Sequence, residues 1–535
     1  MRALGGALAT LLALALAGCG TEEQAPSELV VARTSQPEHL DPALSDRVNT
    51  REPIWLVYTP LLTYRHAEGS DGAELIPGLA GDLPEVSEDG TVYRLELREG
   101  LEYSDRTEVN ASDFEHAIKR VLALRSAGAP LYDGIAGARE YVRAGVADGD
   151  IPGIEADDET GEITITLTAP DATFSNALAM SFTGLVPGDT PFVDLTADPP
   201  PGVGPYEITE SSANRQFVLE RNPAFGGLDI PDIPTGNIER ITTRIVGDRR
   251  EQAQAVLDSR LDFMQDPPPP ELRATVLEQA SDRYIEHATA ATHYFFLNHR
   301  IAPFDDPKVR AAVNYALDRP ALAGVYGGTL KPGCAFLAPG VPGYDEALDT
   351  DACPYGDPTQ PPDVERAREL IAGAGATRTK VTVWGASGRG TRAVAEAYVE
   401  MLNEIGLDAQ PRLAAAGGSR TQLQRRRARA QTGIATASGS FPHPLELYST
   451  VDGGIDDGFV AAELGRLRQV PELDDVAEDW RELDAHLIGP DQSHLAPFGH
   501  PEVATFLSER IEPKSAIFHP LYRNDYSSWE LKEGE

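Results

Sequence analysis

The stretch Asp89-Gly-Thr-Val-Tyr-Arg-Leu-Glu-Leu-Arg-Glu-Gly100 decides more about the fold of this chain than any other. Asp89-Gly90 is a turn dipeptide, and the residues from Val92 to Arg98 alternate between apolar and polar side chains. Successive side chains of a strand point to opposite faces. The stretch therefore predicts a β-strand with one face in a core and the other in water.

Further strands are predicted on both sides of this one. Glu28–Arg33 has the pattern of a short buried strand, and Glu162–Leu167 alternates cleanly. Glu207–Thr209 and Phe217–Glu220 are predicted to pair as a hairpin.

Helices are predicted where a cap precedes an apolar periodic segment. Ser112–Leu124 should begin with a capping box, in which Ser112 caps the helix and Glu115 reaches back to it. Asp306 followed by Pro307 is typical of a second helix start.

The second half of the chain alternates strands with helices. The run Pro267–Pro270 precedes it and indicates a boundary or a crossing point, because proline blocks both helix and central strand. The predicted elements are the helices Asp363–Gly373 and Arg392–Gly406 and the strands Lys380–Trp384 and Ser515–Tyr522. This alternation predicts a mixed α/β domain.

The N-terminus has the plan of a secretory signal. Arg2 is followed by an apolar run from Ala3 to Ala17, which is shorter than the ~20 residues of a membrane-spanning helix. The run ends in Leu16-Ala17-Gly18-Cys19, which resembles the lipobox of bacterial lipoproteins, where the cysteine is lipidated. An ordinary signal peptide that happens to contain a cysteine is the alternative.

Length and charge restrict the class of protein. A chain of 535 residues predicts two or three domains. It carries 84 acidic and 46 basic residues, a net charge of -38. Because binding to phosphates needs a basic face, this balance argues against a nucleic-acid partner.

Three cysteines occur, and two of them remain once Cys19 is set aside. Cys334 and Cys353 are predicted to form a disulfide, which would stabilise the fold by about 3 kcal/mol. A metal site is the alternative, but neither cysteine has a His or Cys neighbour at ligand spacing.

No sequence motif indicates a catalytic site. The chain lacks the H-E-x-x-H, G-x-S-x-G, Walker and G-x-G-x-x-G motifs, and its 11 histidines are scattered. We therefore expect neither an enzyme nor a bound metal or cofactor.

A colinear series of short matches resembles the family 5 extracellular solute-binding proteins, the peptide-binding components of ABC importers. The most specific match is Asp89–Gly100 itself. The others are Glu38–Pro42, Tyr58–Leu62, Leu75–Ala80, Ser104-Asp105, Asp113-Phe114, Gly204–Tyr206, Arg221–Pro223, Phe296–Asn298, Pro303–Arg310 and Tyr315–Arg319.

The resemblance implies an α/β, two-lobed fold of the type II periplasmic-binding-protein kind, with a domain inserted in the N-terminal lobe. The expected segments are a signal peptide (1–18), a lipidated linker (19–27), lobe 1 (28–59, 176–291 and 491–535), the inserted domain (60–175) and lobe 2 (292–490).

It also implies the partners. A peptide would bind between the two closing lobes and pass to the permease subunits of an ABC transporter, whose ATPases act indirectly through the permease. We expect a monomer, lipid-anchored at the outer face of the cytoplasmic membrane or in the periplasm.

One strand departs from the pattern of the family's peptide binders, which reads roughly Gly-Trp-x-Ala-Asp-Tyr-x-x-Pro and supplies an aspartate for the ligand's ammonium group. Anchored on Pro444, this chain has Ala437 at the tryptophan position and Ser440 at the aspartate position. Asp452 is a candidate substitute, and a turn cap is its alternative role. The predicted ligand-binding residues are Gln36, Trp384, Ser438, Gly439, Ser440, Phe441 and Asp452.

Two other functions stay open at this point. A protein of the same fold could bind a non-peptide solute, such as a metal chelate or an oligosaccharide. A surface lipoprotein could instead sense a ligand without any transporter.

Overall fold

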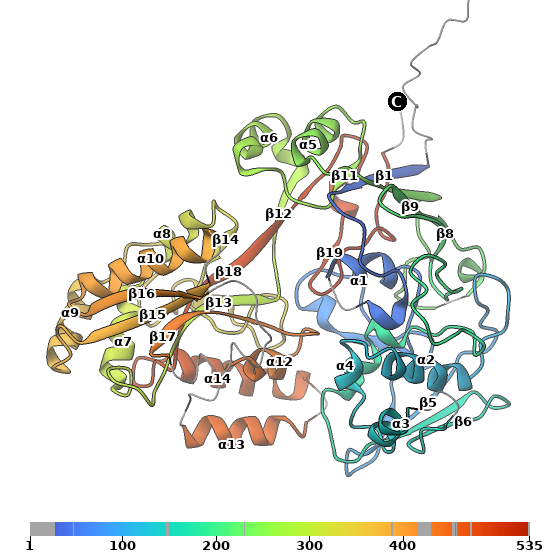
Figure 1. Cartoon of the computed structure of the whole chain (residues 1–535), viewed down its shortest axis with the longest axis horizontal. Helices are drawn as coiled ribbons and strands as arrows, with labels where there is room; N and C mark the ends of the chain where they lie inside the picture. The colour runs from blue at the N-terminus through green and yellow to red at the C-terminus, as the bar shows by residue number, and fades with distance from the viewer. Residues whose placement is uncertain are drawn as a thin grey trace, which may run out of the picture.

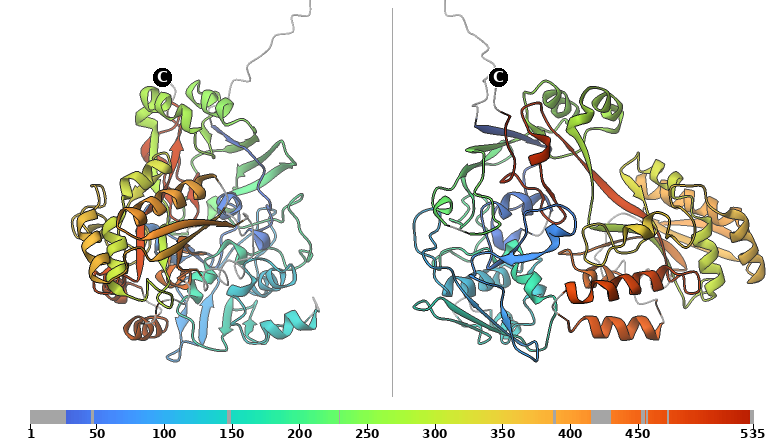
Figure 2. Two further views of the ribbon diagram at one scale, coloured as in Figure 1. Left: turned by 60° about the vertical axis from the view of Figure 1, so that its left-hand side comes forward. Right: turned by 180° about the vertical axis from the view of Figure 1, so that it is seen from behind.

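The computed structural model describes residues 27–45, 48–145, 149–228, 230–386, 389–414, 430–451, 455, 457–470 and 473–532. Two lobes lie side by side and are joined by long crossing strands (Figures 1 and 2). Lobe 1 is built on a five-stranded sheet and lobe 2 on a seven-stranded sheet. These sheets define the lobes below, and the exact domain boundaries stay predictions.

Lobe 1 has the strand order β11-β1-β10-β9-β8. The side chains of β1 alternate between two cores, since Leu29 and Val31 pack on one face and Val30 and Ala32 on the other. Its strands and helices are β1 (Glu28–Arg33), α1 (Val48–Trp55), β8 (Tyr206–Ser212), β9 (Gln216–Arg221), β10 (Arg240–Ile245), α5 (Arg249–Leu257), β11 (Phe263–Met264) and α6 (Arg273–Ala280). The predicted strand Glu28–Arg33 and the predicted hairpin are confirmed.

The inserted domain holds a four-stranded antiparallel sheet in the order β4-β5-β7-β6. Strand β5 lies within the Asp89–Gly100 stretch, with Tyr93 and Leu95 buried and Arg94 and Glu96 exposed, so the predicted one-sided strand is confirmed. The elements of this region are β2 (Leu62–Tyr64), β3 (Leu75–Pro77), β4 (Glu85–Val86), β5 (Val92–Glu96), α2 (Ser112–Ala123), α3 (Ala138–Ala144), β6 (Ile154–Ala156), β7 (Glu162–Thr166) and α4 (Phe174–Leu178).

The capping box predicted for α2 is wrong. Ala111, not Ser112, occupies the cap position, and no side chain caps the helix from there. The backbone N–H of Ser112 instead donates to Asp158 at 2.8 Å, and Glu115 accepts from the backbone N–H of Ile151 at 2.7 Å. Ser112 and Glu115 therefore bond to Asp158 and Ile151 of the same domain rather than to each other's backbone.

A buried ion pair ties α2 to lobe 1. The guanidinium of Arg120 donates to both carboxylate oxygens of Asp41, at 3.0 and 2.7 Å, and both side chains are buried. Asp41 lies in the loop after β1 and also accepts from the backbone N–H of Ala43. The inserted domain is therefore fixed to the loop that leads into α1.

Lobe 2 carries helices on both faces of its sheet. Phe295 of β13 packs with α7, α9 and α10, whereas the adjacent Tyr294 packs with α12, α14 and the disulfide loop. The elements are β13 (Ala291–Leu297), α7 (Pro307–Ala316), α8 (Arg319–Val325), β14 (Leu330–Pro332), α9 (Val364–Gly373), β15 (Lys380–Ala386), α10 (Arg389–Glu404), β16 (Asp408–Ala414), β17 (Thr432–Ser438), α12 (Pro444–Ser449), α13 (Gly458–Leu467) and α14 (Ala477–Ile488).

The predicted starts of two of these helices are confirmed. Asp306 accepts from the backbone N–H of Lys308 at 2.8 Å ahead of Pro307, and Asp363 accepts from that of Arg366. The predicted late strand Ser515–Tyr522 is mostly wrong, because only β19 (Phe518–His519) is a strand there, paired with β20 (Arg523–Asn524).

Two antiparallel strands cross between the lobes: β12 (Tyr284–Ala288), which continues into β13, and β18 (Leu495–Phe506). Strand β18 pairs with β13 through its first half and with β12 through its second. At Gly499 the φ angle is +154°, and a Cβ there would lie 2.4 Å from the carbonyl oxygen of Lys331 in β14. Glycine thus lets β18 bend where it leaves lobe 2.

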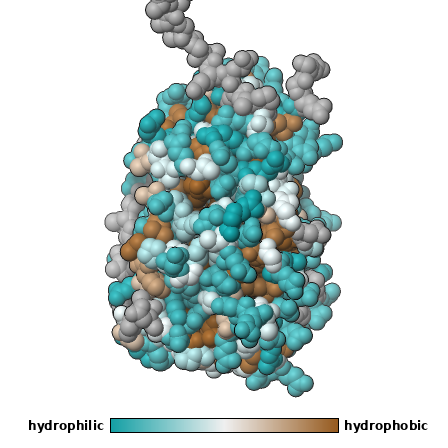
Figure 3. Space-filling view, turned by 90° about the vertical axis from the view of Figure 1, so that its right-hand side faces the viewer, coloured by the Kyte–Doolittle hydropathy of each residue, from teal (hydrophilic) through white to brown (hydrophobic). Residues whose placement is uncertain are grey.

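The face of lobe 1 and the inserted domain in Figure 3 is mostly hydrophilic, with hydrophobic residues in small separate groups. None of the helices in the described ranges combines the length and the apolar character that a membrane crossing requires.

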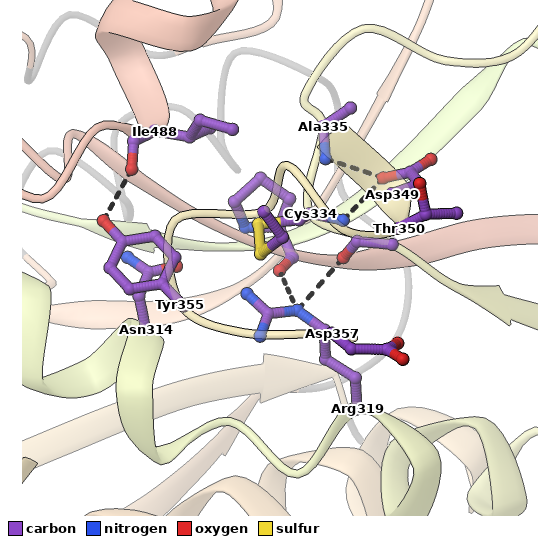
Figure 4. The surroundings of a disulfide bond; sticks show 12 residues. Asn314, Arg319, Cys334, Ala335, Asp349, Thr350, Tyr355, Asp357 and Ile488 are labelled. Atoms are coloured by element: carbon purple, nitrogen blue, oxygen red, sulfur yellow. Dashed lines mark hydrogen bonds between the residues drawn. A yellow bond between two sulfur atoms is a disulfide. The ribbon is translucent and has the colours of Figure 1, made fainter. Parts of the chain in front are cut away.

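The structure joins Cys334 and Cys353 in a disulfide, with the two Cα atoms 5.9 Å apart (Figure 4). Asp349 accepts from the backbone N–H groups of Cys334 and Ala335, at 2.6 and 2.8 Å. Next along the chain, Phe336 and Leu337 donate their N–H groups to Asp484 of α14, at 3.1 and 3.2 Å. Two buried carboxyl groups therefore organise the loop.

Burial raises the pKa of Asp484 from its ordinary value of 3.8 to about 7. The folded protein then binds a proton here more tightly than the unfolded chain, so this contribution to stability is present at low pH and is lost as the pH rises from 4 to 7. At 1.36 kcal/mol per pKa unit, the loss is at most on the order of 4 kcal/mol.

We expect Asp484→Asn to remove this part of the pH dependence, because the amide oxygen can still accept from the loop but does not ionise. The measurement is the free energy of unfolding in urea at pH 4 to 8, with the exposed Asp351→Asn as control. Parallel pH profiles for wild type and Asp484→Asn would contradict the assignment.

Candidate functional site at the junction of the lobes

The segment Ser438–Phe441 leaves the end of β17 beside the crossing strands. Ser438 is paired with Ala291, the first residue of β13, directly after β12. The next helix, α12, begins at Pro444. Four of the predicted ligand-binding residues therefore lie where the chain passes between the lobes.

This segment contacts lobe 1. The Nη1 atom of Arg51 in α1 donates to the carbonyl oxygen of Ser440 at 2.9 Å. Phe441 is 2% exposed and belongs to the core cluster that also holds Trp55, Tyr64 and Tyr522. Residues nearly 400 positions apart in the sequence thus meet at one place.

A carboxylate lies beside Ser440. The backbone N–H of Ser440 donates to Oε2 of Glu446 at 2.8 Å. A Cβ at Gly439 would lie 2.4 Å from the Cβ of Glu446, so glycine is needed for the loop to fold against this side chain. Glu446 is half-buried and belongs to the first turn of α12.

Tyr64 lies near charged residues of both lobes. Burial raises the pKa of Tyr64 well above its ordinary value, with smaller contributions of opposite sign from Arg51 and Glu446. Glu446 of lobe 2 and Arg51 of lobe 1 therefore share the surroundings of Tyr64.

His443 is a neutral cap rather than a cation for a ligand. Its Nδ1 accepts from the backbone N–H of Leu445 at 3.1 Å, which places the ring proton on Nε2. Burial lowers the pKa of His443 to about 3. The aromatic rings of Phe441 and Trp480 lie edge-on to it, at 6.4 and 6.3 Å between ring centroids.

Of the other predicted residues, Trp384 and Gln36 make their described contacts elsewhere. Trp384 pairs with Gly433, five residues before Ser438 on β17, or roughly 16 Å at about 3.3 Å per residue. Its ring lies 4.4 Å from the guanidinium carbon of Arg412. Gln36 accepts from the backbone N–H of Asn214 at 2.5 Å, within lobe 1. Asp452 and Cys19 lie outside the described residues.

Arg51 and Glu446 were missed by the sequence reasoning. Arg51 carries no local signal, because its partner is 389 residues away. Glu446 did carry a local signal. His443-Pro444 predicts a helix start, and an acidic residue at the third helical position can reach back toward the segment before the cap.

Residues 74–457 match the profile of the bacterial extracellular solute-binding proteins, family 5. The chain belongs to this family. The family assignment makes it a solute-binding protein rather than an enzyme, and the predicted family is confirmed.

Two relatives illustrate the family. The glutathione-binding protein GsiB of Escherichia coli K12 is 28% identical over 65% of this chain. The match spans 63% of the length of the E. coli protein. The di/tripeptide-binding protein 2 of Pseudomonas aeruginosa is 27% identical over 71% of this chain and 70% of its own.

Solved structures confirm the two-lobed fold. The clavulanic acid biosynthesis oligopeptide binding protein 2 has a TM-score of 0.80 at 23% identity, with 95% of each chain covered. The unliganded open form of the periplasmic murein tripeptide binding protein MppA has a TM-score of 0.79 at 19% identity, covering 94% of this chain and 97% of its own. A complex of Haemophilus influenzae OppA with the peptide RPPGFSPFR has a TM-score of 0.63 at 17% identity, covering 95% and 99%.

Gly439→Ala should disturb the junction, because the new methyl group meets Glu446 and the carbonyl oxygen of Phe441 at 2.7 Å. We expect the free energy of unfolding to fall by about 1–3 kcal/mol. Gly465→Ala, in helix α13 with open space around it, is the matched control and should stabilise by up to about 1 kcal/mol. Equal unfolding midpoints for the two variants in urea would show that the loop is not packed as described.

Proposed function

We propose that the protein is the extracytoplasmic substrate-binding lipoprotein of an ABC importer, capturing short peptides between its lobes and delivering them to a membrane permease. Family membership supports the general class. Relatives named for glutathione and for di- and tripeptides support a short peptide as the solute.

The observation that carries the proposal is the position of Ser438–Phe441. The segment continues a sheet strand, lies beside the crossing strands and contacts Arg51 of the opposite lobe. A peptide can pair its backbone with such a strand, and backbone hydrogen bonds are common to all peptides. The arrangement therefore suits broad recognition of peptides.

The ligand's ammonium group needs a carboxylate, since an unpaired buried charge costs several kcal/mol. We assign this role to Glu446, whose Oε2 lies 2.8 Å from the backbone nitrogen of Ser440. The acidic residue would then lie in the first turn of α12 and not at the strand position that Ser440 occupies. Asp452 stays an alternative.

The anchor completes the proposal. Lipidation of Cys19 would hold the mature protein on the outer face of the membrane through the linker 19–27. Tethering raises the effective concentration of captured ligand at the permease.

The solute class can be tested by thermal shift and calorimetry on the purified protein. We expect glutathione and free-amine di- and tripeptides to raise the melting temperature, and their N-acetylated forms to bind at least tenfold more weakly. If an oligosaccharide or a metal chelate raises the melting temperature and no peptide does, the protein binds a non-peptide solute instead.

Glu446→Gln should weaken binding of a free-amine tripeptide by about tenfold or more, the loss of one buried charge pair. Glutamine can still accept from Ser440, so the loop should keep its conformation. The exposed Glu478→Gln is the control, and Asp452→Asn is measured beside it. Unchanged affinity in Glu446→Gln with a loss in Asp452→Asn would transfer the role to Asp452.

A further inference from the structure

Three potential metal ligands meet in lobe 2. Oδ2 of Asp457 lies 3.0 Å from Nε2 of His486 and 2.9 Å from Nε2 of His494. All three ligand atoms lie within 4.8 Å of one another. Asp457 precedes α13, His486 is in the last turn of α14, and His494 directly precedes β18.

The two oxygens of Asp457 have separate tasks. Oδ1 accepts from the backbone N–H groups of Phe459 and Val460, at 2.8 and 3.2 Å, and so caps α13. Oδ2 faces the two histidines. The helix cap thus fixes the carboxylate with one oxygen turned toward both imidazoles.

A third histidine, His299, contacts His494. Nε2 of His299 lies 3.1 Å from the carbonyl oxygen of His494, which can only accept, so Nε2 of His299 carries the proton. In neutral His299, Nδ1 is then an acceptor, and it lies 3.4 Å from Nδ1 of His494. His494 therefore donates from Nδ1, and in neutral His494 the lone pair of Nε2 faces the carboxylate of Asp457.

Two acceptors that face each other at 2.9 Å are held together by a cation, which is either a proton on His494 or a metal ion. We propose that Asp457, His486 and His494 bind a divalent transition-metal ion of the zinc type. Imidazole nitrogen with carboxylate oxygen suits Zn²⁺, whereas Ca²⁺ and Mg²⁺ prefer oxygen ligands alone.

Two of the three separations between ligand atoms are close to those of a zinc site. Ligand atoms about 2.0–2.1 Å from a tetrahedral zinc ion are about 3.3 Å apart. The N–O separations of 2.9 and 3.0 Å are within a few tenths of an ångström of that value. His299 supplies the acceptor that orients a metal-bound histidine through its other ring nitrogen.

Exposure leaves one side of the site accessible. The side chain of His494 is 2% exposed and that of His486 is 29% exposed. Three protein ligands with a solvent-facing side allow water or an external ligand to take the fourth position. Arg310, which lies near His299 and His494, directs its guanidinium to the carbonyl oxygens of Gln492 and Phe304 and leaves Asp457 free for the metal.

The test is calorimetric titration of the chelator-treated protein with ZnCl₂ in excess Mg²⁺, which occupies sites made of carboxylates alone. We expect one Zn²⁺ per chain, a higher melting temperature, and at least tenfold weaker binding in His486→Gln. Co²⁺ in place of Zn²⁺ should give the visible absorption of a tetrahedral site, which His486→Gln abolishes.

His39→Gln is the matched control. His39 pairs with Asp194 at 3.2 Å and is 25% exposed, so it resembles His486, but the described residues place no third metal ligand beside this pair. Its Zn²⁺ binding should equal that of wild type. Absence of one saturable Zn²⁺ per chain in wild type, or equal binding in His486→Gln and wild type, would overturn the proposal without affecting the peptide titrations.

Discussion

The pairing of β18 with β12 and β13 is the constraint on which the rest of the structure depends. This one strand and the residue after it contribute to four cores. Leu495 and Phe498 pack on opposite faces of the lobe 2 sheet, and Phe506 and Leu507 pack on opposite faces of the lobe 1 sheet. Because side chains alternate along a strand, a shift of one residue in this register would exchange the faces in both lobes at once.

The sequence predicted those strands and helices well whose turns and caps are made by residues close together in the chain. The Asp-Gly turn with its alternating strand and the Asp306–Pro307 helix start are present as predicted. The capping box at Ser112 is wrong because Asp158, 46 residues further along, provides a carboxylate that the sequence could not place there. The strand Ser515–Tyr522 is reduced to two residues, since most of its apolar side chains pack in a core without a neighbouring strand.

The candidate site was predictable in part. The family pattern located Ser438–Phe441, because that pattern is continuous in sequence. The pattern could not predict Arg51, whose contact with Ser440 depends on how the lobes meet. Trp384 lies in the same sheet, but it pairs with Gly433, five residues before Ser438. The sequence did not predict the histidine cluster for a similar reason. Asp457 is 29 residues from His486 and 37 from His494, so the three residues do not form a motif with helical spacing.

The crossing between the lobes is a two-stranded ribbon and not a pair of independent linkers. The hydrogen bonds between β12 and β18 hold the two strands in one register, so neither strand can slide along the other without breaking them. A displacement of one lobe along the ribbon would therefore cost several backbone hydrogen bonds at once.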